Sequence, residues 1–503
     1  MRTTRWRKKK TLGNNWVLFA VGMSFLALSL FMVLQDRKTF LTQTRVLPSG
    51  SLIGEIPVGG LEVQAALERV LEAYSIPVEL RYQGARMQFL PEQLGCSLDL
   101  GGITQQLTES SKGTGWWAHM WGRVATEEPI NLPINLSVEN SVAEEVMQTE
   151  IPPRYDRQAT SAHPIVGDTA FAVGQTGTTL DLGSSLPLVS AALTSPDQRV
   201  VDLKVEITQA GGADWADLQV MLKQQLIREN FRGLAEVYLA DPATGKLIHF
   251  AQRNLSDVPV DVAYSGASTV KIPVMVSVMR RTEEPTPNLA LGWMNATITQ
   301  SLNPPADALM KTYLDNNRGP LIVTEDMQEL GYQNTFLAGY FEPGSPLLRK
   351  FDTPANSRRD VYLDPDFYNQ TVPSEAGDLL MRIYQCSLDP AQPLFDGQVT
   401  QTECETMLGF LRNNRIGALI ESGLPPSAVA AHKHGWVVAL DGYLHTMSDA
   451  GVIYTPGGDF VLVIFIHTEE QLVFETGERI FARLSQSIYN FYNLNDQMAW
   501  LVD

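Results

Sequence analysis

The order of hydrophobic and polar positions divides the chain into one apolar segment and two mixed regions. A nearly continuous apolar run extends from Trp16 to Leu34 and, at about 1.5 Å rise per residue, is long enough for a membrane-spanning helix. Between residues 45 and 208, short alternating runs and apolar repeats of helical spacing follow one another. The same patterns recur in longer elements over 212–503. The sequence therefore predicts an α+β protein: an N-terminal transmembrane helix, a small α+β module and a larger domain.

The break Gln209–Ala213, made of small residues, predicts a linker between the two mixed regions. In the smaller module, strands are expected at 78–82, 87–90, 130–138 and 200–207, with helices at 61–71 and 140–149. In the larger domain, the patterns predict a helix at 215–229, strands at 235–240 and 246–250, a strand starting at Lys433, two strands within 450–465 and a terminal helix at 475–492.

The residues around the apolar segment decide between an anchor and a cleaved signal peptide. A basic tail at 1–13 precedes the apolar segment at 14–35, and such a tail is found before membrane anchors and before signal peptides alike. The apolar run exceeds the roughly 7–15 residues of a signal peptide core, and Asp36-Arg37-Lys38 is not a small-residue cleavage site. We therefore expect a single-pass anchor. The positive-inside rule predicts a cytoplasmic N-terminus and an exported remainder of the chain.

Composition and charge narrow the range of partners. The chain carries a formal charge of −18, and six basic residues lie within the first ten, which leaves −18 − 6 = −24 for the rest. Such an acidic body argues against nucleic acid or anionic lipid as its partner. Three cysteines do not form a disulfide scaffold or a metal motif. Cys386 and Cys404 could pair outside the cell or remain buried thiols.

The candidate chemistry is concentrated in the stretch Tyr264–Pro273. Ser268 and Lys271 are three positions apart, a spacing that puts an amine beside a hydroxyl on one face of a helix. A neighbouring base is what a serine needs to act as a nucleophile. This pattern alone is weak, because a serine before a helix is often only a cap. Two further patterns follow it in order, Ser301-x-Asn303 and Lys433-x-Gly435.

These three patterns occur together in class A β-lactamases and penicillin-binding proteins. Residues 212–503 resemble this serine hydrolase superfamily in motif order and in the order of expected elements. The resemblance implies a β-lactamase-like α/β/α domain with an antiparallel sheet and a helical subdomain.

The resemblance also assigns roles to individual residues. Ser268 would be the nucleophile that is acylated, and Lys271 would take or relay its proton. Ser301 would pass a proton toward the leaving nitrogen. Asn303 would orient Lys271 and a substrate amide, and Lys433 would attract the substrate carboxylate.

Around Lys433, the resemblance is only partial. His434 stands where the family usually has a threonine or serine hydroxyl that holds the carboxylate, and Gly435 completes the motif. The oxyanion hole would consist of the backbone N–H groups of Ser268 and Trp436. Because imidazole is bulkier than a hydroxyl group, the substrate preference is left open.

The sequence contains no Arg-x-Glu-x-x-Asn phrase that would supply the usual deacylating glutamate. Glu342 and Glu375 are the candidate deacylation bases, since Glu342-Pro343 resembles the family loop and Glu375 follows a Thr-x-Pro phrase. Glu342 could equally be an exposed loop acid, and Glu375 an acid in the first turn of a helix. Asp364 and Asp366 lie in the following loop and are also considered.

Histidines offer a different chemistry. His432, His434 and His445 lie near one another in sequence, but a zinc site would need a third well-placed ligand. We predict no metal and no cofactor.

The module at 45–208 resembles a domain linked to peptidoglycan binding, found in vancomycin-resistance accessory proteins. The resemblance rests on the phrases at 90–100 and 177–182 and on the pair Gly122-Arg123. It implies cell-wall contact, and the tryptophans at 116, 117 and 121 could stack on sugar rings. The alternatives are a spacer module and tryptophans that belong to the core.

Together these observations predict a membrane-anchored, extracytoplasmic serine hydrolase. Its substrate would be a β-lactam or a D-Ala-D-Ala peptide of the peptidoglycan stem. Two alternatives remain, a penicillin-binding D,D-peptidase with slow deacylation and a catalytically silent wall-binding protein.

Overall fold

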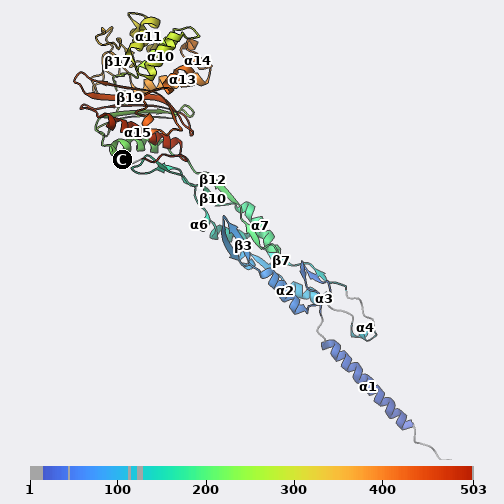
Figure 1. Cartoon of the computed structure of the whole chain (residues 1–503). Helices are drawn as coiled ribbons and strands as arrows, with labels where there is room; N and C mark the ends of the chain where they lie inside the picture. The colour runs from blue at the N-terminus through green and yellow to red at the C-terminus, as the bar shows by residue number, and fades with distance from the viewer. Residues whose placement is uncertain (1–14, 43–45, 111–114, 122–127, 501–503) are drawn as a thin grey trace, which may run out of the picture. The chain divides into compact units, whose positions relative to one another are not determined.

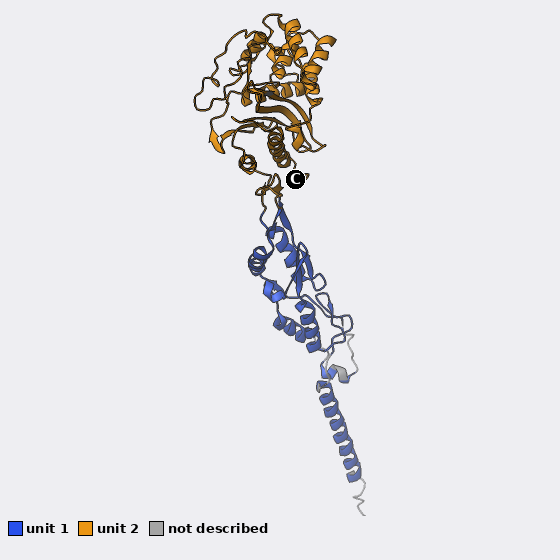
Figure 2. Cartoon of the chain, turned by 60° about the vertical axis from the view of Figure 1, so that its left-hand side comes forward, with its two compact units in different colours: residues 1–158, 176–208 blue, residues 159–175, 209–503 orange. Residues whose placement is uncertain are grey.

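The computed structural model describes residues 15–42, 46–110, 115–121 and 128–500. The predicted basic tail at 1–13 and the pair Gly122-Arg123 lie outside the described residues. The chain divides into two compact units, which Figure 2 shows in blue and orange. Unit 1 consists of Met1–Gln158 and Thr176–Thr208, and unit 2 of Ala159–Gln175 and Gln209–Asp503.

The apolar segment predicted from the sequence forms helix α1 (Asn15–Thr42), drawn in blue in Figure 1. Within it, Trp16–Leu41 is long and apolar enough to cross a membrane, and none of its most apolar window is buried against the rest of the chain. Exposed leucine, phenylalanine and methionine side chains on all sides suit a lipid environment better than water.

The rest of unit 1 consists of short strands and helices around two small hydrophobic cores. Its sheets have the strand orders β2-β1-β6, β11-β3-β4, β10-β12 and β5-β7. The strands are β1 (Leu52–Ile53), β2 (Ile56–Pro57), β3 (Val78–Tyr82), β4 (Ala85–Phe89), β5 (Cys96–Leu98), β6 (Asn131–Leu132), β7 (Leu136–Val138), β10 (Gly177–Leu180), β11 (Val200–Asp202) and β12 (Val205–Thr208). The helices are α2 (Val63–Ser75), α3 (Leu100–Ser110), α4 (Trp116–Met120), α5 (Asn140–Glu150), α6 (Pro152–Tyr155) and α7 (Leu182–Thr194).

The single strand expected at 200–207 is wrong, because the segment forms two strands in different sheets. β11 pairs in parallel with β3, whereas β12 pairs antiparallel with β10. The segment 130–138 is likewise divided into β6 and β7. Alternating hydrophobicity predicts extended structure but does not report a change of partner strand.

Unit 2 is built on a six-stranded sheet with the order β15-β14-β13-β20-β19-β18, in which all neighbours are antiparallel. Its strands are β13 (Leu234–Ala240), β14 (Leu247–Arg253), β15 (Ser256–Val258), β18 (Val429–Val438), β19 (Leu444–Tyr454) and β20 (Phe460–His467). A hairpin of β8 (His163–Pro164) and β9 (Phe171–Ala172) also belongs to this unit. The α+β class predicted from the sequence is confirmed.

Helices cover both faces of this sheet (Figure 1). One face packs against α8 (Trp215–Arg228) and α15 (Phe474–Tyr492) through a core that includes Leu222, Ile464 and Phe481. The opposite face packs against the helical part through a second core. That part contains α9 (Lys271–Met279), α10 (Asn288–Thr299), α11 (Asn303–Leu309), α12 (Gly319–Glu329), the short pair β16 (Phe336–Leu337) and β17 (Asn369–Gln370), α13 (Pro373–Leu388) and α14 (Gln401–Arg412).

Of the three cysteines, two are paired and one is free. Cys386 on α13 and Cys404 on α14 form a disulfide. Cys96 in unit 1 is a buried free thiol, and burial raises its pKa.

Candidate active site

The reaction centre predicted from the sequence lies where the chain enters α9. Ser268 is in a turn rather than in the helix, which begins at Lys271. The Lys271 N–H donates to the Ser268 carbonyl at 3.3 Å, so the two residues still lie one tight turn apart. Ala267, directly before the serine, has φ +47°, a left-handed conformation that is uncommon for a residue with a Cβ. Such strained backbone is often found at functional sites.

The Lys271 amine is the centre of the hydrogen-bond network. It donates to Ser268 Oγ at 3.0 Å, to Asn303 Oδ1 at 2.8 Å and to the Ser301 carbonyl at 2.7 Å. Ser301 Oγ lies 3.5 Å away. Lys271 is fully buried, and this burial lowers the pKa of its amine to about 8, against the opposing charge of Asp307. The lowered pKa raises the share of the neutral amine near neutral pH, and the neutral amine is the form that accepts a proton.

Ser301 and Asn303 reach this amine from the segment that joins α10 to α11. Ser301 has φ +58°, which turns the chain before α11 begins at Asn303. Asp307 in the same helix was not predicted as a site residue from the sequence. Its buried carboxylate accepts the backbone N–H groups of Phe341 and Glu342, each at 2.8 Å. Asp307 lies four residues after Asn303, a helical spacing that could have revealed it.

Lys433 lies in the middle of β18 rather than at its start. Its fully buried amine donates to the His434 carbonyl at 3.0 Å and is 3.4 Å from His434 Nε2. Burial and, second, the charge of Lys271 lower its pKa to about 7. The structure therefore brings the Lys433 and Lys271 charges near each other, while no hydrogen bond between Lys433 and Ser301 occurs among the described residues.

His434 is only 3% exposed, which places it behind the site rather than in it. Its ring stacks on Trp436 with centroids 4.5 Å apart, and Asn414 donates to its Nδ1 at 3.1 Å. Burial lowers the pKa of His434 to about 2, with the charge of Lys433 acting in the same direction, so the ring is neutral.

Gly435 brings β18 against the nucleophile turn. A Cβ on Gly435 would lie 3.1 Å from Ser268 N and 2.8 Å from Ser448 Oγ, so only glycine fits without displacement. This close approach puts the start of α9 beside a strand edge. The oxyanion hole predicted from the Ser268 and Trp436 N–H groups is consistent with that proximity and stays a prediction.

Ser268 opens into a cavity of about 350 Å³. Trp436, Asn303 and the loop 339–345 line it, together with Asp366. The Phe341 ring of that loop lies 5.3 Å from Lys271 Nζ, a distance that allows a cation–π contact.

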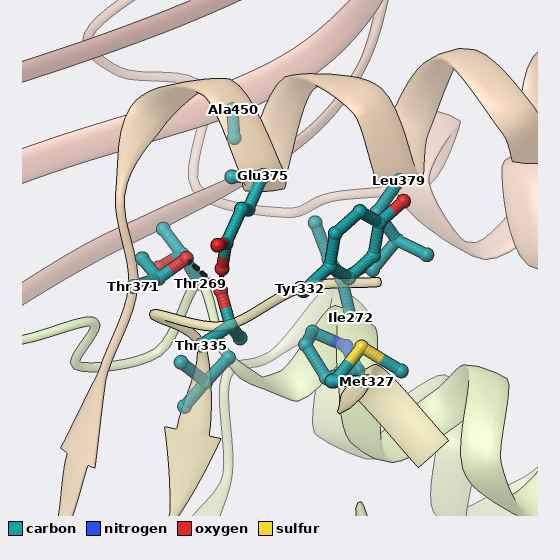
Figure 3. Close-up of a pocket in the computed structure, with 12 residues that line it drawn as sticks. Thr269, Ile272, Met327, Tyr332, Thr335, Thr371, Glu375, Leu379 and Ala450 are labelled. Atoms are coloured by element: carbon teal, nitrogen blue, oxygen red, sulfur yellow. Dashed lines mark hydrogen bonds between the residues drawn. The ribbon is translucent and has the colours of Figure 1, made fainter. Parts of the chain in front are cut away.

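The two candidate deacylation bases have different surroundings. Glu342 lines the Ser268 cavity, but its side chain is 65% exposed and forms an ion pair with Lys311 at 3.3 Å. Glu375 lies in a separate pocket at the start of α13, where its carboxylate points toward Thr335 (Figure 3). It accepts hydrogen bonds from residues 333–335, including Thr335 Oγ1 at 2.7 Å. These contacts favour a structural role for Glu375.

Asp366 combines a position at the Ser268 cavity with partial burial, whereas Glu342 is exposed and Glu375 lies in a separate pocket. Asp366 is among the residues that line the Ser268 cavity, and burial raises the pKa of its carboxyl group despite a hydrogen bond from the Tyr368 N–H. The Asp366 N–H donates to Ser265 Oγ at 2.7 Å, which fixes this loop beside the nucleophile turn. Asp364, two residues earlier, is exposed and does not line the cavity.

The histidines considered for a metal do not converge. His432 and His434 have centroids 6.4 Å apart, and His432 Nδ1 contacts Asp449 at 2.9 Å. His445 Nε2 pairs with Asp441 at 2.8 Å.

Residues 290–492 match the model of the family described as "Beta-lactamase enzyme family". This match covers less than half of the chain. It includes Ser301, Asn303, Lys433 and Gly435, and begins after Ser268 and Lys271.

Solved structures with similar arrangements are penicillin-binding proteins and β-lactamases. A mutant of PBP-A, in its acyl-enzyme complex with penicillin G, has 18% identity and a TM-score of 0.41, and the alignment covers 56% of this chain and 97% of that one. A β-lactamase from Chitinophaga pinensis has 16% identity and a TM-score of 0.42, with 54% and 98% covered. A β-lactamase from Sphaerobacter thermophilus has 16% identity and a TM-score of 0.41, with 57% and 100% covered. No curated protein matches the chain.

Proposed function

We propose that this protein is a membrane-anchored serine hydrolase in which Ser268 is acylated by a β-lactam or by a D-Ala-D-Ala-like peptide. The observation that carries the proposal is the 3.0 Å contact between Lys271 Nζ and Ser268 Oγ, made by a buried amine of lowered pKa. A serine hydroxyl becomes an effective nucleophile when a neighbouring group takes its proton.

The acylation step follows from this geometry. The neutral Lys271 amine takes the proton from Ser268 Oγ as the oxygen attacks the carbonyl carbon of the substrate amide. Backbone N–H groups of Ser268 and Trp436 stabilise the oxyanion. The proton then passes to the leaving nitrogen by way of Lys271 and Ser301, and the amide C–N bond breaks to leave the acyl-enzyme.

A second candidate function is a penicillin-binding D,D-peptidase, in which the acyl-enzyme is hydrolysed slowly. The surroundings of the loop carboxylates favour this candidate. Glu342 is exposed and ion-paired, and Glu375 is engaged by residues 333–335. Activation of the water molecule that hydrolyses the acyl-enzyme would then depend on Asp366, at a position where the family does not usually have its deacylating base.

The anchor and unit 1 complete the proposal. Helix α1 would hold the protein in the cell membrane with the N-terminus in the cytoplasm and both units outside. The disulfide between Cys386 and Cys404 supports an oxidising compartment. Trp117 and Trp121 are 65% and 75% exposed, which favours surface contact, such as stacking on peptidoglycan sugars, over a core role.

The test uses the detergent-solubilised full chain with a fluorescent penicillin and a chromogenic cephalosporin. Rapid colour without lasting label indicates a β-lactamase, and lasting label without turnover indicates a penicillin-binding peptidase. Absence of both signals from folded protein would contradict the proposal and favour a silent wall-binding protein.

A further inference from the structure

His434 occupies the second position of the Lys433-x-Gly435 motif and presents a ring nitrogen to the Lys433 amine. Its Nε2 lies 3.4 Å from Lys433 Nζ, and both side chains are buried. The amine also donates to the His434 carbonyl at 3.0 Å, and it forms no ion pair with any of the described residues. Which nitrogen of the His434 ring carries the proton therefore determines whether this neighbour favours the charged or the neutral amine.

Asn414 determines the position of that proton. Its Oδ1 accepts the Ile416 N–H at 3.2 Å, and this hydrogen bond assigns the orientation of the amide, with Nδ2 toward the histidines. Nδ2 lies 3.1 Å from His434 Nδ1, and because an amide nitrogen is only a donor, Nδ1 is the acceptor. A neutral imidazole has one donor and one acceptor, so its proton is on Nε2, the nitrogen beside Lys433.

His432, the other ring near Asn414, is compatible with this assignment. Its Nδ1 is 2.9 Å from Asp449 and its Nε2 is 3.3 Å from Glu421. Burial alone would lower the pKa of His432, but the charges and hydrogen bonds of the two carboxylates raise it to about 9. A charged His432 donates from both nitrogens, so the second hydrogen of Asn414 Nδ2 goes to the His432 carbonyl at 3.3 Å.

Two donors therefore face each other when Lys433 is charged. An ammonium group has no lone pair and cannot accept the His434 Nε2–H, whereas a neutral amine can. The charged groups on the neighbouring elements do not compensate, because Lys271 on α9 repels the ammonium and Asp449 on β19 is already bound to His432. Burial and the charge of Lys271 lower the pKa of Lys433 to about 7, and the contact with His434 acts in the same direction.

We propose that His434 is a positioning residue that makes the recognition of a substrate carboxylate by Lys433 depend on pH. Its Nε2–H stabilises the neutral amine, so the site attracts a carboxylate only at a pH low enough for Lys433 to bind a proton. Above that pH, the site favours substrates that have no carboxylate beside the reacting amide. This inference rests on the proposed function, in which the substrate acylates Ser268.

The test compares benzylpenicillin with its methyl ester, in which the carboxylate charge is removed. The second-order rate constant of acylation is measured for both compounds from about pH 5 to about 9 with the detergent-solubilised full chain. The effect of pH on Lys271 acts on both rates and cancels in their ratio. We expect the ratio of benzylpenicillin to ester to fall as pH rises through about 7.

His434→Thr replaces the Nε2–H by a hydroxyl group whose oxygen can accept from the ammonium. It should raise the midpoint of the fall in the ratio by about one pH unit. A variant that only loosened the packing would change both rates without moving this midpoint.

Two variants at neighbouring positions keep the test interpretable. Asn414→Asp retains Oδ1 but replaces the donor to His434 Nδ1 by an acceptor, so Nε2 can accept from Lys433 and the midpoint should again rise. Asn413→Asp is the control, because it adds the same charge at an exposed position and should leave the midpoint unchanged. An unchanged midpoint in both folded His434→Thr and Asn414→Asp, or an equal rise in Asn413→Asp, would overturn the proposal.

Failure of this inference can be told apart from failure of the proposed function. If folded protein is acylated by neither compound, the proposed function is wrong and the inference about His434 is overturned with it. If both compounds acylate Ser268 with a ratio that does not change with pH, only the inference about His434 is overturned.

Discussion

Gly435 on β18 and Ser268 in the turn before α9 approach so closely that a Cβ on the glycine would lie 3.1 Å from the serine nitrogen. Gly435→Ala should therefore push the strand away from the N–H group proposed to stabilise the oxyanion. We expect acylation by penicillin to slow by about 10²-fold or more, the usual loss for an oxyanion donor. The acylation rate is measured by stopped-flow with a fluorescent penicillin. Gly292→Ala is the control, because no atom lies within 4 Å of its added Cβ, and equal rates in Gly435→Ala and wild type would contradict the role of this contact.

Lys271→Arg tests whether the amine acts as a base or only as a charge. A guanidinium retains the positive charge but does not release its proton at accessible pH. Acylation should fall by about 10²–10⁴-fold, as when a general base is lost. Lys223→Arg is the matched control on the surface, where Lys223 pairs with Asp257 at 2.7 Å. A variant that acylates as fast as wild type would rule out proton transfer to Lys271.

The two buried lysines predict the pH dependence of acylation. Lys271 must be neutral to accept a proton, so the rate should rise with pH through about 8. Lys433 must be charged to attract a substrate carboxylate, so KM should rise as pH increases through about 7. The result is a bell-shaped kcat/KM with its maximum between these values, and the apparent constants belong to the pair.

This profile is measured with a carboxylate-bearing β-lactam between pH 5 and about 10, a range that spans both transitions. Lys433→Met should remove the increase in KM at alkaline pH, and the acylation rate should still rise with pH. A profile that is flat across both transitions would contradict the assignment of either lysine.

We expect Asp366 to affect the rate of deacylation and Glu375 to affect the stability of the fold. Asp366→Asn should prolong the acyl-enzyme without slowing its formation, because Asp366 lines the Ser268 cavity. Glu375→Gln should leave turnover unchanged but lower stability by about 2 kcal/mol, since it weakens the hydrogen bonds from residues 333–335.

Label decay after washing and chemical unfolding distinguish these two effects. Glu342→Gln is the control, as an exposed acid in the same cavity. Slower deacylation in Glu342→Gln or Glu375→Gln, with none in Asp366→Asn, would reverse the assignment.

The sequence predicted local patterns well and spatial relationships poorly. The Ser268-x-x-Lys271 spacing anticipated their contact, because three residues of a tight turn determine it. It could not place His434, since β18 alternates its faces and the packing of Asn414 and Trp436 decides which side is buried. The contact between Glu236 on β13 and His249 on β14, 2.8 Å apart, was not predicted either, because strand register and not sequence proximity brings the two residues together.

Labelling of Ser268 tests the central proposal most directly. The full chain is incubated with fluorescent penicillin, digested and analysed by mass spectrometry, with Ser422→Ala as a control whose hydroxyl bonds only Glu478 among the described residues. We predict one labelled peptide that contains Ser268, equal label in Ser422→Ala and none in Ser268→Ala. Label that persists in a folded Ser268→Ala variant, or wild-type label on another residue, would contradict the account.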